Sequence, residues 1–243
     1  PLEDGISRVV VHQRSEGSGP MIRSEFRMTP GEVGHVADLV LREGPAAVDP
    51  WLVDVPVPPR EIAICTQGSH DICCGADGTR LVGQLASTRP ELTVRKVSHT
   101  GGHRYAPTGL TFPDGRMWGF ISVDEMGRIL DREGSPATLA HRCRGWTGTD
   151  GVGQVAERAV FAMLDDWAID DIPRSVETEA NGDGWLATVG VAGRRFEVEV
   201  ERGRAVPTIA CRADGGLPAK PGTEYRVVGV SEVCSLRRLF SRR

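Results

Sequence analysis

The pattern of apolar and polar residues predicts a strand followed by an amphipathic helix near the start of the chain. The β-branched run Ile6–His12 lies between Gly5 and a polar stretch, as is typical of a strand. The segment Thr29–Glu32 combines a capping hydroxyl, an early proline and a glutamate three residues after the cap, which predicts a helix over about 30–43. Gly44 is its predicted end. His12 and His35 are predicted at the surface, and the apolar face of the helix is predicted to hold Val33, Val36, Val40 and Leu41.

A second pattern, from about residue 60 to 131, predicts a compact α/β unit. A proline-rich connector over 50–59 leads into the apolar strand Glu61–Cys65. Next come a helix over Asp77–Ser87 that turns Leu81, Val82 and Leu85 inward, and a strand over 92–97. Asp114-Gly115 between two apolar runs indicates a β-hairpin, and a helix over about 123–131 follows it.

The remaining residues predict further helices and then antiparallel strands. Helices are expected over 135–141 and 151–167, and alternating strands over 175–200 and 225–230. Trp167 and Trp185 are expected to pack this part on the core. The fold class is therefore α/β, in four regions: an N-terminal strand and helix (1–59), the core (60–131), a helical segment (132–172) and a small antiparallel β region (173–243).

Composition narrows the classes of function. A net charge of −4 without a basic stripe argues against a nucleic-acid-binding protein, and no run of about twenty apolar residues predicts a membrane span. The first residues lack the features of a secretory signal, so we expect a cytoplasmic protein with reduced thiols. Three of the six cysteines stand alone in the sequence and are predicted to be buried apolar residues: Cys143, Cys211 and Cys234.

The other three cysteines, with two histidines, form the candidate chemistry. Cys65 ends a predicted strand, Cys73 and Cys74 stand just before a helix whose amino terminus favours a thiolate, and His99 and His103 lie in a glycine-rich loop. Thiolates and imidazoles bind soft and borderline metals, so one metal or redox site is predicted. Three versions remain open from spacing alone: structural zinc, a dithiol at Cys73 and Cys74, or an iron–sulfur cluster.

A resemblance favours the third version. The pattern Cys65-Thr66-x-Gly68-Ser69-x-Asp71-x-x-Cys74-Gly75, followed by His99-x-Gly101-Gly102-His103-Arg104-Tyr105-Ala106-Pro107-Thr108, resembles the sucrase/ferredoxin-like family, whose members are similar to thioredoxin-fold ferredoxins. The resemblance is most specific over about 60–120, and the chain departs from the family at Gln67 and His70. It implies a thioredoxin-like core and a [2Fe–2S] cluster held by Cys65, Cys74, His99 and His103, with Cys74 rather than Cys73 as the second thiolate.

These ligands lead to a functional hypothesis: a soluble electron-transfer protein. Two thiolates and two neutral imidazoles neutralise an oxidised cluster, which predicts a reduction potential above that of four-cysteine ferredoxins. The potential should also fall with rising pH if the imidazoles keep a protonatable nitrogen toward solvent. No nucleotide fingerprint is present, so a redox partner protein is expected to donate and accept electrons. The alternatives are a reductase that reduces a bound acceptor such as a ferric chelate, and a structural-zinc protein. No carboxylate pair is placed for glycoside hydrolysis.

Overall fold

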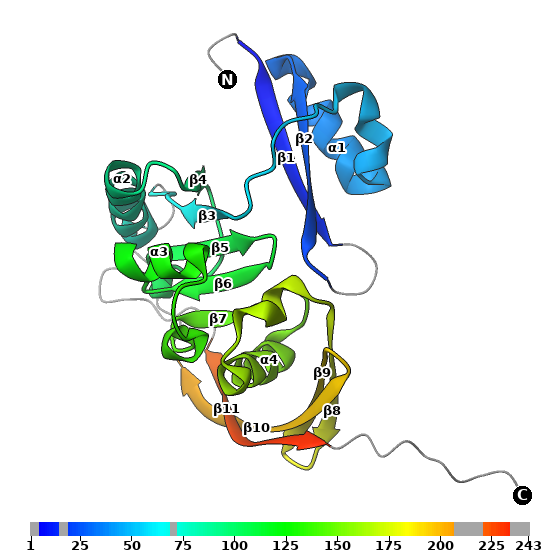
Figure 1. Ribbon diagram of the computed structural model, residues 1–243, viewed down its shortest axis with the longest axis vertical. Coiled ribbons are helices and arrows are strands. Elements are labelled where there is room, and N and C mark those ends of the chain that lie inside the picture. Colours follow the sequence, from blue (N-terminus) through cyan, green and yellow to red (C-terminus); the bar gives the residue numbers. More distant parts are fainter. Residues whose placement is uncertain (1–4, 15–18, 69–71, 207–220, 234–243) are drawn as a thin grey trace, which may run out of the picture.

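The core of the molecule is a five-stranded mixed sheet. In the computed structural model, which describes residues 5–14, 19–68, 72–206 and 221–233, the strand order is β4-β3-β5-β6-β7. Figure 1 shows this sheet between an N-terminal and a C-terminal unit. The strands are β3 (Glu61–Cys65), β4 (Thr93–Val97), β5 (Thr108–Phe112), β6 (Arg116–Gly119) and β7 (Cys143–Trp146).

The connections confirm the predicted thioredoxin-like order of strand, helix, strand, hairpin and helix. Strand β3 runs parallel to β4, and α2 (Thr79–Thr88) connects them. Strand β5 pairs antiparallel with both β3 and β6, across the predicted hairpin, and α3 (Val123–Asp131) follows. The apolar face of α2 is buried as predicted, through Leu81, Val82 and Leu85.

The helical segment before α2 begins earlier than the sequence pattern predicts. Residues 72 and 73 are already helical, and the wide π-helical turn η3 (Cys74–Gly78) leads directly into α2. The prediction that Cys74 precedes the helix is therefore wrong, because Cys74 lies within its first turns. The two glycines of η3 are weak helix formers, and close packing of this turn on β3 overrides that local preference.

The N-terminal unit is a hairpin covered by a helix, with its own small core. Strands β1 (Ser7–Arg14) and β2 (Met21–Met28) pair antiparallel, and the short turn η1 (Pro30–Glu32) opens α1 (Val33–Glu43). The 3-10 turn η2 (Pro45–Trp51) shows that Pro50 belongs to a helical turn, so the non-helical connector begins after it. The buried cluster consists of Phe26, Met28, Val36 and Val48.

Two predictions for this unit are wrong and one is confirmed. Leu41 is 85% exposed, whereas Leu39 packs on the buried cluster, because positions 36, 39 and 40 share the helix face that meets the hairpin. His35 is exposed as predicted. His12 is not at the surface: its side chain is only 10% exposed.

His12 belongs to a charged cluster that fastens the N-terminal hairpin to the core sheet. Its Nε2 lies 2.5 Å from Glu61 Oε1, and its ring stacks on Phe112 at 3.8 Å between ring centres. Arg95 Nε donates to Glu61 Oε2 at 2.6 Å and Arg23 Nε to Oε1 at 3.3 Å. Burial raises the pKa of Glu61, but hydrogen bonds from His12 and Arg95 outweigh it and lower the pKa to about 2. The carboxylate is therefore charged at neutral pH.

The segment predicted to be wholly helical, 132–172, also contributes a strand to the core sheet. Its first predicted helix is only the 3-10 turn η5 (Pro136–Leu139), and β7 follows and pairs antiparallel with β6. The four residues of β7 have no apolar alternation, so pairing with β6 rather than local pattern creates this strand. Cys143 on β7 is buried as predicted, while Cys211 and Cys234 lie outside the described residues.

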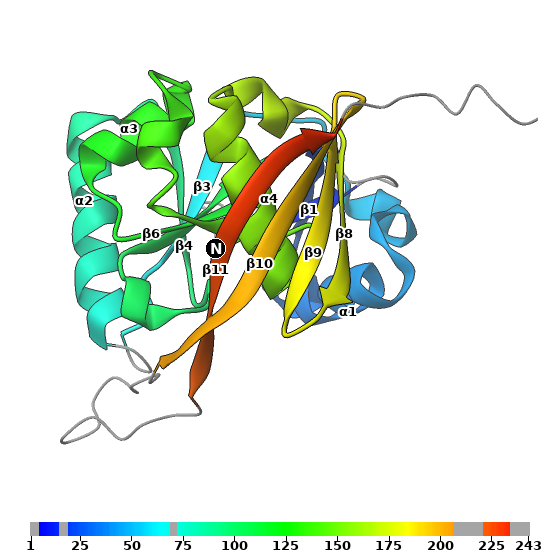
Figure 2. The ribbon, with the colours of Figure 1, turned by 90° about the horizontal axis from the view of Figure 1, so that it is seen from below.

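The C-terminal unit is an antiparallel sheet wrapped around a helix, as Figure 2 shows. Helix α4 (Gly151–Leu164) contacts β7 of the core sheet and all four strands of this sheet. One hydrophobic cluster therefore continues from Ile62 of the core to Val198 of the C-terminal sheet. Trp167, in the turn η6 (Trp167–Asp171), packs against Trp118 of the core, whereas Trp185 packs against Tyr225. The strands are β8 (Arg174–Asn181), β9 (Gly184–Val191), β10 (Arg194–Val206) and β11 (Gly222–Val233).

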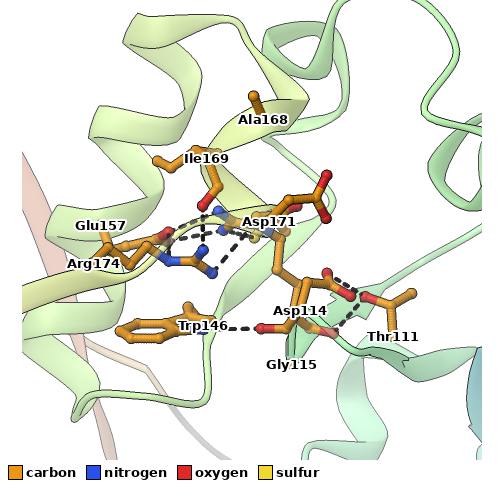
Figure 3. A network of polar contacts seen from close by, with 12 residues as sticks. Thr111, Asp114, Gly115, Trp146, Glu157, Ala168, Ile169, Asp171 and Arg174 are labelled. Atoms are coloured by element: carbon orange, nitrogen blue, oxygen red, sulfur yellow. Dashed lines mark hydrogen bonds and ion pairs between the residues drawn. The ribbon is translucent and has the colours of Figure 1, made fainter. Parts of the chain in front are cut away.

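A buried ionic network joins the core sheet to the C-terminal unit (Figure 3). Arg116 of β6 is wholly buried and donates to Glu157 Oε1 at 2.7 Å and to Asp170 Oδ1 at 2.6 Å. Arg174 of β8 lies 3.0 Å from Glu157, and Arg132 lies 2.5 Å from Asp170. Burial lowers the pKa of Arg116, but the two carboxylates raise it well above its ordinary value. The guanidinium therefore stays charged inside the protein.

Candidate metal centre

Cys65 lies at the end of the core sheet where the histidine loop begins. It is the last residue of β3, is buried, and its Sγ donates to the carbonyl oxygen of Ser98 at 3.5 Å. In the parallel register Cys65 faces Val97, so His99 follows two residues beyond its partner. The pairing of β3 with β4 therefore brings the first thiol and the histidine loop to one edge.

The second thiol comes from a turn that packs directly on the backbone of Cys65. A Cβ at Gly78 would lie 1.9 Å from the carbonyl oxygen of Cys65, and a Cβ at Gly75 would lie 2.4 Å from the Cα of Gly68. Only glycine permits these two approaches, which press η3 against the end of β3 and against the loop after it. Cys74, in the same turn, is buried at 2% exposure, whereas its neighbour Cys73 is only half-buried.

The histidine loop is bent by two consecutive glycines and held at both ends. Gly101 and Gly102 have φ values of 76° and 72°, as the predicted tight bend requires. The hydroxyl oxygens of Thr100 and Thr108 lie 2.7 Å apart, which ties the loop to β5. His99 exposes its side chain to solvent. His103 opens the 3-10 turn η4 (His103–Tyr105), and its side chain lies outside the described part of the structure.

Arg144 of β7 lies behind this loop, and the sequence pattern did not single it out. Its Nη1 donates to the carbonyl oxygen of Gly101 at 2.8 Å, and its guanidinium carbon lies 4.6 Å from the centre of the Tyr105 ring. Burial lowers the pKa of Arg144 and Arg104 acts in the same direction, while Tyr105 and the thiols of Cys143 and Cys74 oppose them. The guanidinium is therefore within electrostatic reach of Cys74. Arg144 is 43 residues from Gly101 in the chain, so no local motif points to it.

Comparison with known protein families matches residues 13–145, more than half of the 243 residues, to the sucrase/ferredoxin-like family. The chain belongs to the sucrase/ferredoxin-like family. The family match includes the four predicted ligands and Arg144, and it ends within β7. Comparisons with curated proteins and with solved structures find no match.

Within the sucrase/ferredoxin-like region, the fold brings the segments that carry Cys65, Cys74 and His99 to one end of the core sheet. Among the side chains that the structure describes, no three histidine, cysteine or acidic residues lie close enough together to hold a metal ion. The side chain of His103 and residues 69–71 lie outside the described part of the structure, so the set of four ligands stays a prediction. The donor types fit a soft metal or an iron–sulfur cluster, since two buried thiols and the start of the histidine loop belong to segments at the same end of the sheet.

No described helix has both the length and the apolar character needed to cross a membrane.

Proposed function

We propose that this chain is an electron-transfer protein whose cofactor is a [2Fe–2S] cluster held by Cys65, Cys74, His99 and His103. One observation carries the proposal. The buried thiol of Cys65 touches the carbonyl of Ser98, next to His99, while the turn that holds the buried Cys74 packs on the backbone of Cys65 itself. The segments that carry the two thiols and the start of the histidine loop are thus held together by backbone packing.

When bound, such a cluster supplies one-electron chemistry. The chain supplies the ligands, and the burial of Cys65 and Cys74 limits the access of water to both sulfurs. Two thiolates and two neutral imidazoles leave an oxidised site close to neutral, whereas four thiolates would leave it negative, so a reduction potential toward the Rieske range is expected. By analogy with thioredoxin-like ferredoxins, we place both cysteines on one iron and both histidines on the other.

The exposure of His99 supports a potential that depends on pH. An imidazole in contact with water can exchange the proton of its second nitrogen with solvent. If reduction favours that protonated form, the potential falls as pH rises. A redox titration between about pH 6 and 10 measures this, and a flat potential would contradict the pH dependence while leaving the cluster in place.

Electrons are expected to come from, and pass to, partner proteins, because the sequence carries no dinucleotide-binding fingerprint. Mixing the reduced protein with candidate acceptor proteins and following the visible spectrum tests this part. Turnover of a ferric chelate would instead favour a reductase.

The ligand set is tested by metal analysis and spectroscopy of anaerobically purified protein. We expect two irons and two sulfides per chain, a visible charge-transfer spectrum and a [2Fe–2S] EPR signal after reduction. Cys74→Ser is expected to lose or alter this signal, whereas Cys73→Ser, one residue away and less buried, is expected to keep it. A colourless protein with one zinc contradicts the proposal, and the reverse result for the two serine variants shows that Cys73 is the ligand.

A further inference from the structure

We infer that Arg144 is a positioning residue for this centre, which fixes the loop from His99 to His103 and places a permanent positive charge against that loop, and that this charge raises the reduction potential. This inference rests on the proposed function. It concerns a residue of β7, outside both of the segments that carry the predicted ligands.

The contacts of Arg144 converge on the histidine loop. Its Nη1 holds the carbonyl oxygen of Gly101 at 2.8 Å, which is a charge-assisted hydrogen bond to the backbone between the two predicted histidine ligands. Its planar group lies 4.6 Å from the centre of the Tyr105 ring, in the turn that His103 opens. Arg144 therefore touches the loop on both sides of Gly102, and a shift of this side chain would move the loop.

The backbone leaves room for this guanidinium at two glycines. A Cβ at Gly102 would lie 2.5 Å from Nη2 of Arg144, and a Cβ at Gly119 would lie 3.0 Å from its Cδ. Gly102 also has a φ of 72°, which other residues rarely adopt. The absence of side chains at these two positions lets the arginine pack against the backbone of the loop and of β6.

The charge of Arg144 is not matched by a carboxylate within the part of the chain that the structure describes. Its described contacts are a carbonyl oxygen, an aromatic ring and the electrostatic influence of nearby thiols, Cys74 among them. A partly buried cation is costly unless negative charge lies nearby. Thiolate ligands supply such charge, and it grows when the centre is reduced. The arginine therefore stabilises the reduced state more than the oxidised state.

Arg104 provides a matched control. Its guanidinium carbon lies 4.8 Å from the centre of the same Tyr105 ring, but its side chain is exposed. None of the hydrogen bonds found among the described residues joins it to the carbonyl of Gly101, which Arg144 holds. Replacing Arg104 removes an equal charge near the ring without releasing the loop, and water screens that charge.

The test compares R144Q, R144K and R104Q with the unaltered protein by EPR-monitored redox titration and iron analysis. We expect R144Q to retain the iron and to show an about tenfold less favourable equilibrium constant for reduction, which is about 59 mV for one electron. R144K keeps the charge but lacks the planar fork, so it should recover part of that shift. R104Q should shift the potential by less than a third of the R144Q value.

An R144Q potential equal to that of the unaltered protein, or to that of R104Q, overturns the inference. If R144Q loses its iron, the R144K variant tests the inference instead. An R144K protein that keeps its iron and has a potential close to that of the unaltered protein supports the inference. Loss of iron in R144K as well overturns it. Unaltered protein without iron overturns the proposed function together with the inference. Unaltered protein with iron, beside an unshifted R144Q, overturns the inference alone.

Discussion

Arg116 and Arg144 are two partly or wholly buried arginines on neighbouring strands, and their surroundings differ. Arg116 on β6 has no exposed surface and is held by the carboxylates of Glu157 and Asp170. Arg144 on β7 is half-buried and contacts a carbonyl oxygen and a tyrosine ring, and the thiols of Cys143 and Cys74 lie within its electrostatic reach. One arginine is neutralised by acidic residues that folding brings to it. The other is placed where thiolate ligands of a metal centre would neutralise it.

The difference separates a structural charge from a functional one. The carboxylates around Arg116 belong to the chain itself, so this arginine stays paired whatever is bound. Negative charge near Arg144 would depend on the ionisation of thiols and on binding of the proposed centre. Substitutions in the Arg116 network should therefore change stability. Substitutions of the predicted thiol ligands should change metal content, and substitutions of Arg144 should change the reduction potential.

The largest expected effect comes from breaking the structural network. Arg116→Met leaves two buried carboxylates short of their main partner, which should lower the free energy of unfolding by about 3–5 kcal/mol. Urea denaturation measures this. Arg194→Met, which removes an exposed pair with Glu232, should leave stability unchanged within error. If the folded fraction of Arg116→Met lost its iron as well, the separation between the two regions would fail.

The next effect tests the close packing beneath the thiols. Gly78→Ala would place a Cβ 1.9 Å from the carbonyl oxygen of Cys65, so the turn must move away from β3. We expect the free energy of unfolding to fall by about 1–3 kcal/mol and the iron content per chain to fall severalfold. Gly83→Ala in the same helical stretch meets nothing within 4 Å and should stabilise the protein by about 0.5–1 kcal/mol with full iron content. Equal iron content in both variants would show that this contact does not position the thiols.

Acid pH should reveal the charged cluster at Glu61. The folded protein lowers the pKa of this carboxyl from 4.5 to about 2, so its stabilisation is present above about 4.5 and is lost as pH falls toward 2. With an allowance for solvent screening, the loss is on the order of 2 kcal/mol. Denaturation curves at several pH values give the free energy of unfolding, which should depend less steeply on pH in Glu61→Gln than in the unaltered protein. Asp38→Asn, in an exposed pair with Arg42, should follow the unaltered protein.

The smallest effect is expected at Cys143, a thiol outside the predicted centre. Burial raises its pKa, although the Arg116 guanidinium opposes this, so the thiol should stay protonated and resist alkylation in the native protein. Cys143→Ala should lower the free energy of unfolding by about 1 kcal/mol and keep the full iron content, whereas Cys65→Ala should lose its iron. Loss of iron in Cys143→Ala would place a ligand on β7 and would require a different set of ligands.

The sequence predicted those parts of the fold that depend on local signals. Strand β3, helix α1 and the hairpin between β5 and β6 each follow from an apolar run, a cap or an Asp-Gly turn. Strand β7 could not be predicted in this way, because its residues gain strand structure only from pairing with β6. The buried place of His12 was missed because it depends on Glu61, far along the chain.

The candidate site shows the same limit. Spacing and family resemblance selected Cys65, Cys74, His99 and His103, and the fold places the segments that carry the first three at one end of the sheet. Neither signal could find Arg144, because its role depends on β7 lying beside a loop that ends about forty residues earlier. Residue types and their spacing indicate candidate ligands, whereas the charged side chains that surround those candidates depend on tertiary structure.

The buried ionic network also bears on how much of this chain forms an autonomous folding unit. The family match ends at residue 145, yet Arg116 within it relies on carboxylates at positions 157 and 170. A chain shortened to the matched region would keep every predicted ligand and lose both carboxylates that neutralise Arg116. The matched region and the ionic network around Arg116 are thus different lengths of sequence, and that network reaches Arg174 in the C-terminal sheet.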